Sequence, residues 1–482
     1  MIAVFIVYLV LLIGIVVYSA RRSKTNSDFI LGGKKISGIS LALSERATGE
    51  SAWLLLGLTG LAYSEGMAAI WVAAGCVAGI LFLWIFLAEP LQKLTQKTGA
   101  LTVPALFSET YKGTSRSFGV LTAFITIFFF ILYIAAQFSG AGKIFNDTFH
   151  IDPFWGMVIG SVLVTIYTML GGFITVVATD AFQAILMVFT CVVLPIIALF
   201  TAATLNIDIA NTIIHANYTE PLNHTAGQLT GGLLIINGLS WAFGYTGQPQ
   251  LLVRMMAMRN QAETRQSRWV AVLWTLLSYG GAFMIGVIGY ELVKAGALGE
   301  MTARIAADSE KIMPAMVVTL VNPILAGILL SGAVSAMMST ASSQLIVVST
   351  ASTEDLYHQV SKKKISEKKM LLLNKMLILV VGLIGFLLAI TMEDTVYGLV
   401  SYAWSGIGAS FGPAIVLLLF WKRFSRAGAF ASLITGTVSA VVWKTWLLEP
   451  TGISERLVSY LLAFAMAMIF SLIIPEKQQK RV

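Results

Sequence analysis

The chain has 482 residues, of which 57% are hydrophobic and only 12% are charged. Soluble domains carry about 25% charged residues, so this composition excludes a soluble globular protein. The net charge of +8 does not indicate nucleic-acid binding, because the basic residues cluster at the ends of apolar segments. Basic residues in those places orient a protein in the lipid bilayer. We expect no nucleic-acid partner and no obligate protein partner.

Apolar stretches of about 20 residues recur along the chain, each long enough to cross a hydrocarbon core about 30 Å thick. They predict a single all-α polytopic membrane protein with about thirteen transmembrane helices. The predicted helices cover residues 2–21, 36–63, 65–95, 115–146, 154–171, 177–203, 231–258, 267–294, 312–349, 371–392, 395–421, 425–447 and 455–474.

The charges of the connecting loops predict the orientation of these helices. Acidic or neutral loops, such as 204–230 and 391–395, alternate with basic connections at 21–35, 93–116, 254–268, 362–369, 422–426 and 477–481. Cytoplasmic loops are the basic ones. With thirteen helices, this alternation places the N-terminus outside and the C-terminus in the cytoplasm.

Two predicted helices contain residues that interrupt a helix. The second holds SERATGESAW (44–53), with three charges and Gly49, and the seventh holds WAFGYTGQPQ (241–250), with Gly244, Gly247 and Pro249. Helix interiors disfavour glycine and proline. Because the two interruptions lie five helices apart, they indicate an inverted-repeat transporter with its binding site at the breaks.

A broken helix at membrane depth leaves backbone groups that lipid cannot satisfy, so these groups must line a cavity inside the protein. Carbonyl oxygens suit a hard cation such as sodium, and freed amides suit a carboxylate. The stretch 44–53 is therefore a candidate site for an ion and a solute.

Five segments of the sequence resemble the sodium:solute symporter family, and within it the bacterial sodium/proline symporters. The segments are ILGGKKISGISLALSERATGESAWLLLG (30–57), IYTMLGGFITVVATDAFQ (166–183), SWAFGYTGQPQLLVRMMA (240–257), NPILAGILLSGAVSAMMSTASSQLIVVSTASTEDLY (322–357) and LVSYAWSGIGASFGP (399–413). The resemblance implies a LeuT-like core of five plus five helices, with one helix before the core and two after it. We therefore divide the chain into residues 1–35 (first helix and cytoplasmic loop), 36–421 (transport core) and 422–482 (two additional helices and a short cytoplasmic tail).

The resemblance also implies the ion site. In the family, backbone carbonyls of the second helix and hydroxyls of the ninth hold sodium. The matching positions are the carbonyls of Ala47, Glu50 and Ala336 and the hydroxyls of Ser339 and Thr340. Some members hold a second sodium ion, and here the matching residues are Asp180, Ser342 and Ser343. Without the resemblance, the small residues of the ninth helix also fit helix packing, and Asp180 also fits a helix cap.

The matching solute positions surround the two breaks. They are Ser51, Ala52, Trp53, Tyr133, Gln137, Trp241, Tyr245 and Pro249. Tyrosine and tryptophan offer a flat apolar body with one polar group, which suits a small ring such as proline. A single aromatic residue at helical spacing is more commonly a packing residue, so the proposal depends on their convergence.

The chain departs from the proline symporters in the second helix. Those proteins have aspartate at the position of Gly49, a neutral residue at Glu50, and small residues at Glu45 and Arg46. Lone charges in a membrane are costly, so we expect Glu45 and Arg46 to pair with each other or across the cytoplasmic pathway, with a coupling or gating role. Glu50 is expected to tune ion coupling or to admit protons instead of sodium.

The expected function is sodium-coupled import of a small solute, with L-proline as the leading substrate and Na+ as the coupling ion, across a bacterial inner membrane. The alternative is sodium- or proton-coupled transport of another small solute, such as a sugar, pantothenate, a monocarboxylate or another amino acid. A membrane enzyme is not expected, because the sequence shows no zinc spacing, phosphate loop or nucleophile–base pair. A channel or sensor on the same fold would show no sodium-stimulated uptake against a gradient.

Overall fold

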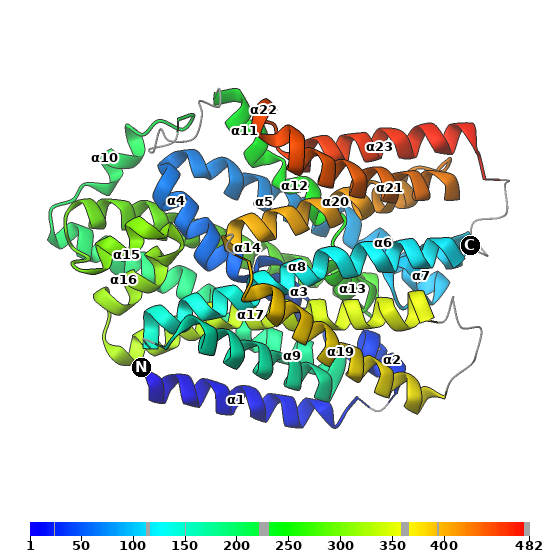
Figure 1. The fold of residues 1–482 in the computed structure, drawn as a ribbon, viewed down its shortest axis with the longest axis horizontal. Coiled ribbons are helices and arrows are strands. Elements are labelled where there is room, and N and C mark those ends of the chain that lie inside the picture. Colours follow the sequence, from blue (N-terminus) through cyan, green and yellow to red (C-terminus); the bar gives the residue numbers. More distant parts are fainter. Residues whose placement is uncertain are drawn as a thin grey trace.

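A computed structural model of the chain describes residues 1–23, 25–111, 116–149, 151–220, 231–357, 366–392 and 395–476, and the secondary structure within them is helical. The end of the predicted cytoplasmic tail, residues 477–482, lies outside these ranges. The long helices run side by side along the molecule (Figure 1). The α-helices are α1 (Ile2–Ala20), α2 (Asn26–Leu31), α3 (Gly38–Ala52), α4 (Thr59–Glu65), α5 (Ile70–Phe82), α6 (Ala88–Thr98), α7 (Val103–Thr110), α8 (Arg116–Phe149), α9 (Pro153–Thr204), α10 (Ile209–Ile214), α11 (Gly231–Leu239), α12 (Trp241–Tyr245), α13 (Pro249–Met256), α14 (Gln261–Lys294), α15 (Met301–Ala307), α16 (Ile312–Leu320), α17 (Pro323–Thr350), α19 (Glu367–Ala389), α20 (Val396–Phe420), α21 (Arg426–Val442), α22 (Leu448–Thr451) and α23 (Glu455–Ile473).

Within the described ranges, ten helical stretches are long and apolar enough to cross a membrane. Two of them, Gly38–Thr98 and Pro153–Thr204, each contain two of the predicted spans. The predicted seventh span consists of the short helices α11, α12 and α13. The all-α polytopic class is confirmed, and the count of thirteen stays a prediction.

One predicted span is wrong. The single helix expected over 312–349 is divided into α16 and α17 by Val321 and Asn322, both in extended conformation. Pro323 explains the division, because the residue before a proline disfavours the helical conformation. The Asn322 side chain then accepts hydrogen bonds from two backbone amides in the first turn of α17. Sequence patterning merged the two helices because both are apolar.

The first interruption lies at Ser51, two residues beyond Gly49. Ser51 has φ +52° and ψ −170°, whereas Gly49 lies within the helical part of α3. A π-helical segment, η2 (Trp53–Leu58), follows the break and leads into α4. Non-glycine residues with this backbone conformation are rare and concentrate at functional sites.

The second interruption separates α12 from α13. Gln248 is extended (φ −84°, ψ 105°), and Pro249 is the first residue of α13, where proline is favoured because that amide has no helical partner. Gly247 packs directly against the backbone of α20 at Gly408 and Gly412. A side chain at Gly247 would push α20 away from the break.

The two ends of the molecule carry different elements. Figure 1 shows α2 and α7 at one end, together with the C-terminal end of α23. The helices α4, α10, α15 and α16 lie at the opposite end. The basic connections predicted to be cytoplasmic adjoin α2, α7 and α23. The end that carries α2 and α7 is therefore the predicted cytoplasmic end.

A third break, at Gly172 in α9, generates the first prediction. Gly172 has φ +61°, and a Cβ built there meets the ring of Phe29 in α2. We expect Gly172→Ala to lower the free energy of unfolding by about 2–4 kcal/mol, since it adds backbone strain and overpacking. Thermal unfolding of the purified protein in detergent measures the loss.

Gly280→Ala is the matched control, because no atom lies within 4 Å of a Cβ built at that position. We expect it to leave stability unchanged or to raise it slightly, since alanine is a better helix former than glycine. Equal unfolding temperatures for the two variants would contradict the assigned role of Gly172.

Candidate functional site

At the break in α3, two backbone groups form hydrogen bonds with residues of two other helices. In an unbroken helix the Ala52 amide would donate to the Thr48 carbonyl. Here it donates to Oε1 of Gln137 in α8, at 3.0 Å. The Thr48 carbonyl instead accepts from the Thr340 hydroxyl of α17, at 2.9 Å. The break therefore exposes backbone groups to α8 and α17.

The structure brings two of the expected sodium residues, Ser339 and Thr340, to this contact between α3 and α17. The hydroxyls of Ser339 and Thr48 lie 3.4 Å apart. Ala47 and Ala336 are fully buried in their helices. Residues 336, 339 and 340 share one helix face by spacing. Backbone carbonyls and hydroxyls are the oxygen donors that hard cations prefer, so this residue set fits a sodium ion.

Asp180 of α9 lies in a second polar cluster beside the first. Its Oδ2 accepts hydrogen bonds from Ser44 (2.7 Å) and Thr48 (3.1 Å). The Ser343 hydroxyl lies 3.5 Å from the same oxygen. The fourth neighbour is the guanidinium of Arg254, 3.2 Å away. Arg254 also donates to Ser343. The carboxylate expected to hold a second sodium ion thus already has a cationic partner.

The sequence places Arg254 both at the end of the predicted helix 231–258 and at the start of the basic connection 254–268, and it is not among the predicted site residues. Its side chain is only 1% exposed and lies in α13. One signal in the sequence was available: Arg254 comes five residues after Pro249, which is less than two helical turns past the break. Ser342, the third residue of the expected second site, donates to the Ser339 carbonyl at 2.9 Å instead.

The three charges of SERATGESAW form one buried network. Nε of Arg46 donates to Glu45 at 2.6 Å, and its Nη1 donates to Glu50 at 2.7 Å. All three side chains are fully buried. The expected pairing of Glu45 with Arg46 is present, and Glu50 joins the same guanidinium. Buried charges are tolerated when they are paired and hydrogen-bonded.

Further donors complete the network. The indole nitrogen of Trp84 donates to Glu45 at 2.9 Å. The Tyr279 hydroxyl donates to Glu50, and the Tyr245 hydroxyl lies 3.5 Å from the same carboxylate. Across this network and the Asp180–Arg254 pair, three acidic groups face two guanidinium groups. The buried region is therefore one cation short of neutrality when all its acids are ionised.

The aromatic residues expected to bind solute also converge. The rings of Trp53 and Trp241 are stacked, with centroids 4.5 Å apart and planes 8° apart. The Tyr133 hydroxyl donates to Ser51 at 3.3 Å. Tyr245 packs edge-on against Trp404 of α20 with centroids 4.7 Å apart. Trp404 was missed by the sequence analysis, although it lies within the quoted segment 399–413.

Among the residues that the structure describes, several buried donors around the breaks have no hydrogen-bond partner. They are the indole nitrogens of Trp53, Trp241 and Trp404 and the side-chain amide nitrogen of Gln137. Buried polar groups are nearly always satisfied, so each exception needs an explanation. A bound solute with hydrogen-bond acceptors, such as a carboxylate, would provide the missing partners.

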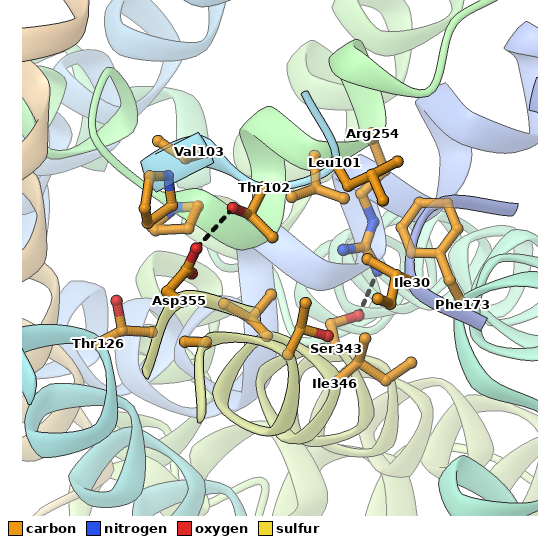
Figure 2. Close-up of a pocket in the computed structure, with 16 residues that line it drawn as sticks. Ile30, Leu101, Thr102, Val103, Thr126, Phe173, Arg254, Ser343, Ile346 and Asp355 are labelled. Atoms are coloured by element: carbon orange, nitrogen blue, oxygen red, sulfur yellow. Dashed lines mark hydrogen bonds between the residues drawn. The ribbon is translucent and has the colours of Figure 1, made fainter. Parts of the chain in front are cut away.

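A cavity adjoins the polar clusters on the side of α2 and α7. Figure 2 shows Arg254 and Ser343 bonded to each other at its wall, and Thr102 bonded to Asp355 elsewhere along it. The lining residues are Ile30, Leu101, Thr102, Val103, Pro104, Thr126, Phe173, Pro249, Val253, Arg254, Ser343, Ile346, Val347, Thr350, Ala351 and Asp355. Pro249, expected at the solute site, therefore lies between the break and this cavity.

The buried network generates the second prediction. Arg46→Met leaves two buried carboxylates without their cation, so we expect the free energy of unfolding to fall by about 3–5 kcal/mol. Arg265→Met is the control, because the Arg265 side chain is 63% exposed in its pair with Glu89, and such pairs contribute less than about 1 kcal/mol. Similar losses of thermal stability in both variants would contradict the structural role of Arg46.

Known proteins resemble this chain over nearly its whole length. It is 33% identical to the sodium/proline symporter of Escherichia coli (strain K12), over 98% of this chain and 93% of the relative. It is 31% identical to the osmoregulated proline transporter OpuE of Bacillus subtilis (strain 168), over 97% and 93%.

A solved structure and a family model agree with these relatives. The fold is similar to that of a Na+-coupled sialic acid symporter in a substrate-bound outward-open state, with TM-score 0.78, 19% identity, and coverage of 99% of this chain and 98% of that one. This similarity confirms the LeuT-like fold. The model of the sodium:solute symporter family matches residues 29–436. The chain belongs to the sodium:solute symporter family.

Proposed function

We propose that this protein is a sodium-coupled symporter that imports L-proline across the bacterial plasma membrane by alternating access. The observation that carries the proposal is the break at Ser51, where the Thr48 carbonyl and the Ala52 amide turn to partners in α17 and α8. Residues 36–421 form the transport core, with the N-terminus outside and the C-terminus in the cytoplasm.

Sodium binds between α3 and α17 in this proposal. Its ligands are the carbonyls of Ala47, Glu50 and Ala336 and the hydroxyls of Ser339 and Thr340. The Thr340 hydroxyl, which bonds to Thr48 in the described structure, turns toward the ion. Ion binding and the packing of α3 on α17 are therefore linked. This link is what couples sodium to a conformational change.

Proline binds on the other side of the break. Its ring packs on the aromatic surface of Trp53, Trp241, Tyr133 and Tyr245. Its carboxylate accepts hydrogen bonds from donors that lack a partner, such as the amide nitrogen of Gln137. Ser51, Ala52 and Pro249 shape the backbone at the two breaks. The names of the relatives, a sodium/proline symporter and a proline transporter, support this solute.

The driving force is adequate for accumulation. One charge crossing about 100 mV releases about 2.3 kcal/mol, and a tenfold sodium gradient adds about 1.4 kcal/mol. A single sodium ion therefore supports accumulation of several hundredfold at equilibrium.

A second candidate is import of a different small solute, such as a sugar, pantothenate, a monocarboxylate or another amino acid. The observation that favours it is the position of Glu50, whose carboxylate approaches Tyr245 of the proposed solute site. Gly49 and Glu50 stand where the proline symporters have aspartate and a neutral residue. A proton bound near Glu50 would replace sodium in the same scheme.

Uptake of labelled proline into proteoliposomes tests the proposal. We expect accumulation with an inward sodium gradient, none with choline, and loss of uptake in the presence of excess unlabelled proline. Thr340→Val should raise the sodium concentration for half-maximal uptake about tenfold, because it removes one ligand. Thr391→Val, at an exposed helix end, serves as the control and should leave it unchanged.

If sodium drives the uptake of another labelled solute, and excess unlabelled proline does not inhibit that uptake, the second candidate is favoured. Uptake driven by a pH gradient, with no effect of sodium, would contradict the ion assignment.

The pairing of Asp180 with Arg254 generates a prediction for ion stoichiometry. Because the guanidinium already neutralises this carboxylate, we propose that one sodium ion is transported per cycle. A second ion at Asp180 and Ser343 would require Arg254 to leave. The initial rate of uptake should depend on external sodium with a Hill coefficient near one, and a coefficient near two would contradict this proposal.

A further inference from the structure

The cavity on the side of α2 and α7 contains a polar group that the proposed sites do not use. Asp355 lies in η6 (Ala351–Tyr357), a π-helical segment that continues α17. It is only 6% exposed. One of its oxygens accepts a hydrogen bond from Thr102 at 3.0 Å, and the other, Oδ2, has no partner within the described part of the chain.

Asp355 also has no cationic partner among the residues that the structure describes. Asp180, by contrast, is fully buried and pairs with Arg254. Burying an unpaired carboxylate is costly, and buried acids in membrane proteins usually lie on a pathway for an ion. A cation that enters from the cavity would stabilise the Asp355 carboxylate at this position.

Two hydroxyls that line the same cavity also lack a hydrogen-bond partner among the described residues. They belong to Thr126 of α8 and Thr350 of α17, and both are buried. Figure 2 shows Thr126 and Thr102 on the same side of the view as Asp355, with Arg254 and Phe173 on the other side. One carboxylate and three hydroxyls thus line the same cavity, and all-oxygen donors suit a hard cation such as sodium.

The cavity extends from this donor set to Ser343, which lies within one turn of the proposed ligands Ser339 and Thr340 on α17. Ser343, Val347, Ala351 and Asp355 all line it, and their spacing places them on successive turns of one helical face. Twelve residues at about 1.5 Å each separate Asp355 from Ser343 by about 18 Å. Most of the other described lining residues are apolar, and Asp355 is the only acidic side chain among them.

We propose that Asp355, with Thr102, Thr126 and Thr350, forms a transient sodium site in the cavity between the main ion site and the predicted cytoplasmic end. This inference rests on the proposed sodium-coupled function. Sodium released from α3 and α17 pauses at Asp355 before it leaves. Cytoplasmic sodium enters by the same residues when it rebinds.

Inhibition by internal sodium tests this site. Proteoliposomes with oriented protein are loaded with graded sodium, and the initial rate of proline uptake is measured at fixed external sodium. Asp355→Asn should need about tenfold more internal sodium for half-inhibition, since it removes the only charged ligand. Activation by external sodium should not change, because the main ion site is intact.

Three variants make the comparison specific. Asp355→Glu keeps the charge and should restore most of the sensitivity. Glu354→Gln makes the same charge change at the neighbouring residue, which bonds to Asn26 outside the cavity lining, and should behave like the wild type. Thr350→Val should raise the half-inhibitory concentration about threefold, because it removes one neutral ligand.

Wild-type sensitivity in Asp355→Asn, with external activation intact, would overturn the inference alone. A change in inhibition by internal proline instead of internal sodium would also overturn it, since Asp355 would then bind the solute. If Asp355→Asn does not accumulate in the membrane, the two threonine variants decide the test. Wild-type inhibition by internal sodium in both Thr350→Val and Thr126→Val would then overturn the inference. If proline uptake by the wild type does not depend on sodium on either side of the membrane, both the proposed function and this inference are overturned.

Discussion

A backbone amide or carbonyl released from a helix inside a bilayer has no water to bond, so another part of the protein must take it up. The break at Ser51 shows how this constraint assembles the core. The Ala52 amide requires Gln137 of α8, and the Thr48 carbonyl requires Thr340 of α17. The same groups are the ones that suit an ion and a solute. A ligand that exchanges for these partners therefore acts directly on helix packing, which links binding to a change of shape.

The buried charges obey a second constraint. Arg46 is held between Glu45 and Glu50, and Arg254 pairs with Asp180. Such networks contribute little net stability relative to well-packed apolar residues, but removing one member is costly. They therefore fix the relative positions of α3, α9 and α13 around the break. With one more acid than base, the region also attracts a cation. This bias agrees with a chain from the sodium:solute symporter family.

Hydropathy was sufficient to predict the class of fold, and the sequences 44–53 and 241–250 were sufficient to predict where two of the helices break. The pairing of Glu45 with Arg46 was also predictable, because lone charges are too costly in a membrane. Three features of the candidate site could not be predicted from the sequence. Ser51 carries the break because the surrounding contacts impose an unfavourable conformation on it. Arg254 lies where the predicted helix 231–258 and the basic connection 254–268 overlap, and its pairing with Asp180 depends on how α13 packs against α9. The position of Trp404 beside Tyr245 depends on how α20 packs against α12.

The central claim is that sodium binds at the break in α3. Hydrogen–deuterium exchange of residues 44–53 in the purified protein tests it most directly, in sodium and in choline. Sodium ligated by the released carbonyls should slow the exchange of these amides, and it should have no such effect in the Ser339→Ala/Thr340→Val double variant. Equal exchange in sodium and choline for the wild type would contradict the claim.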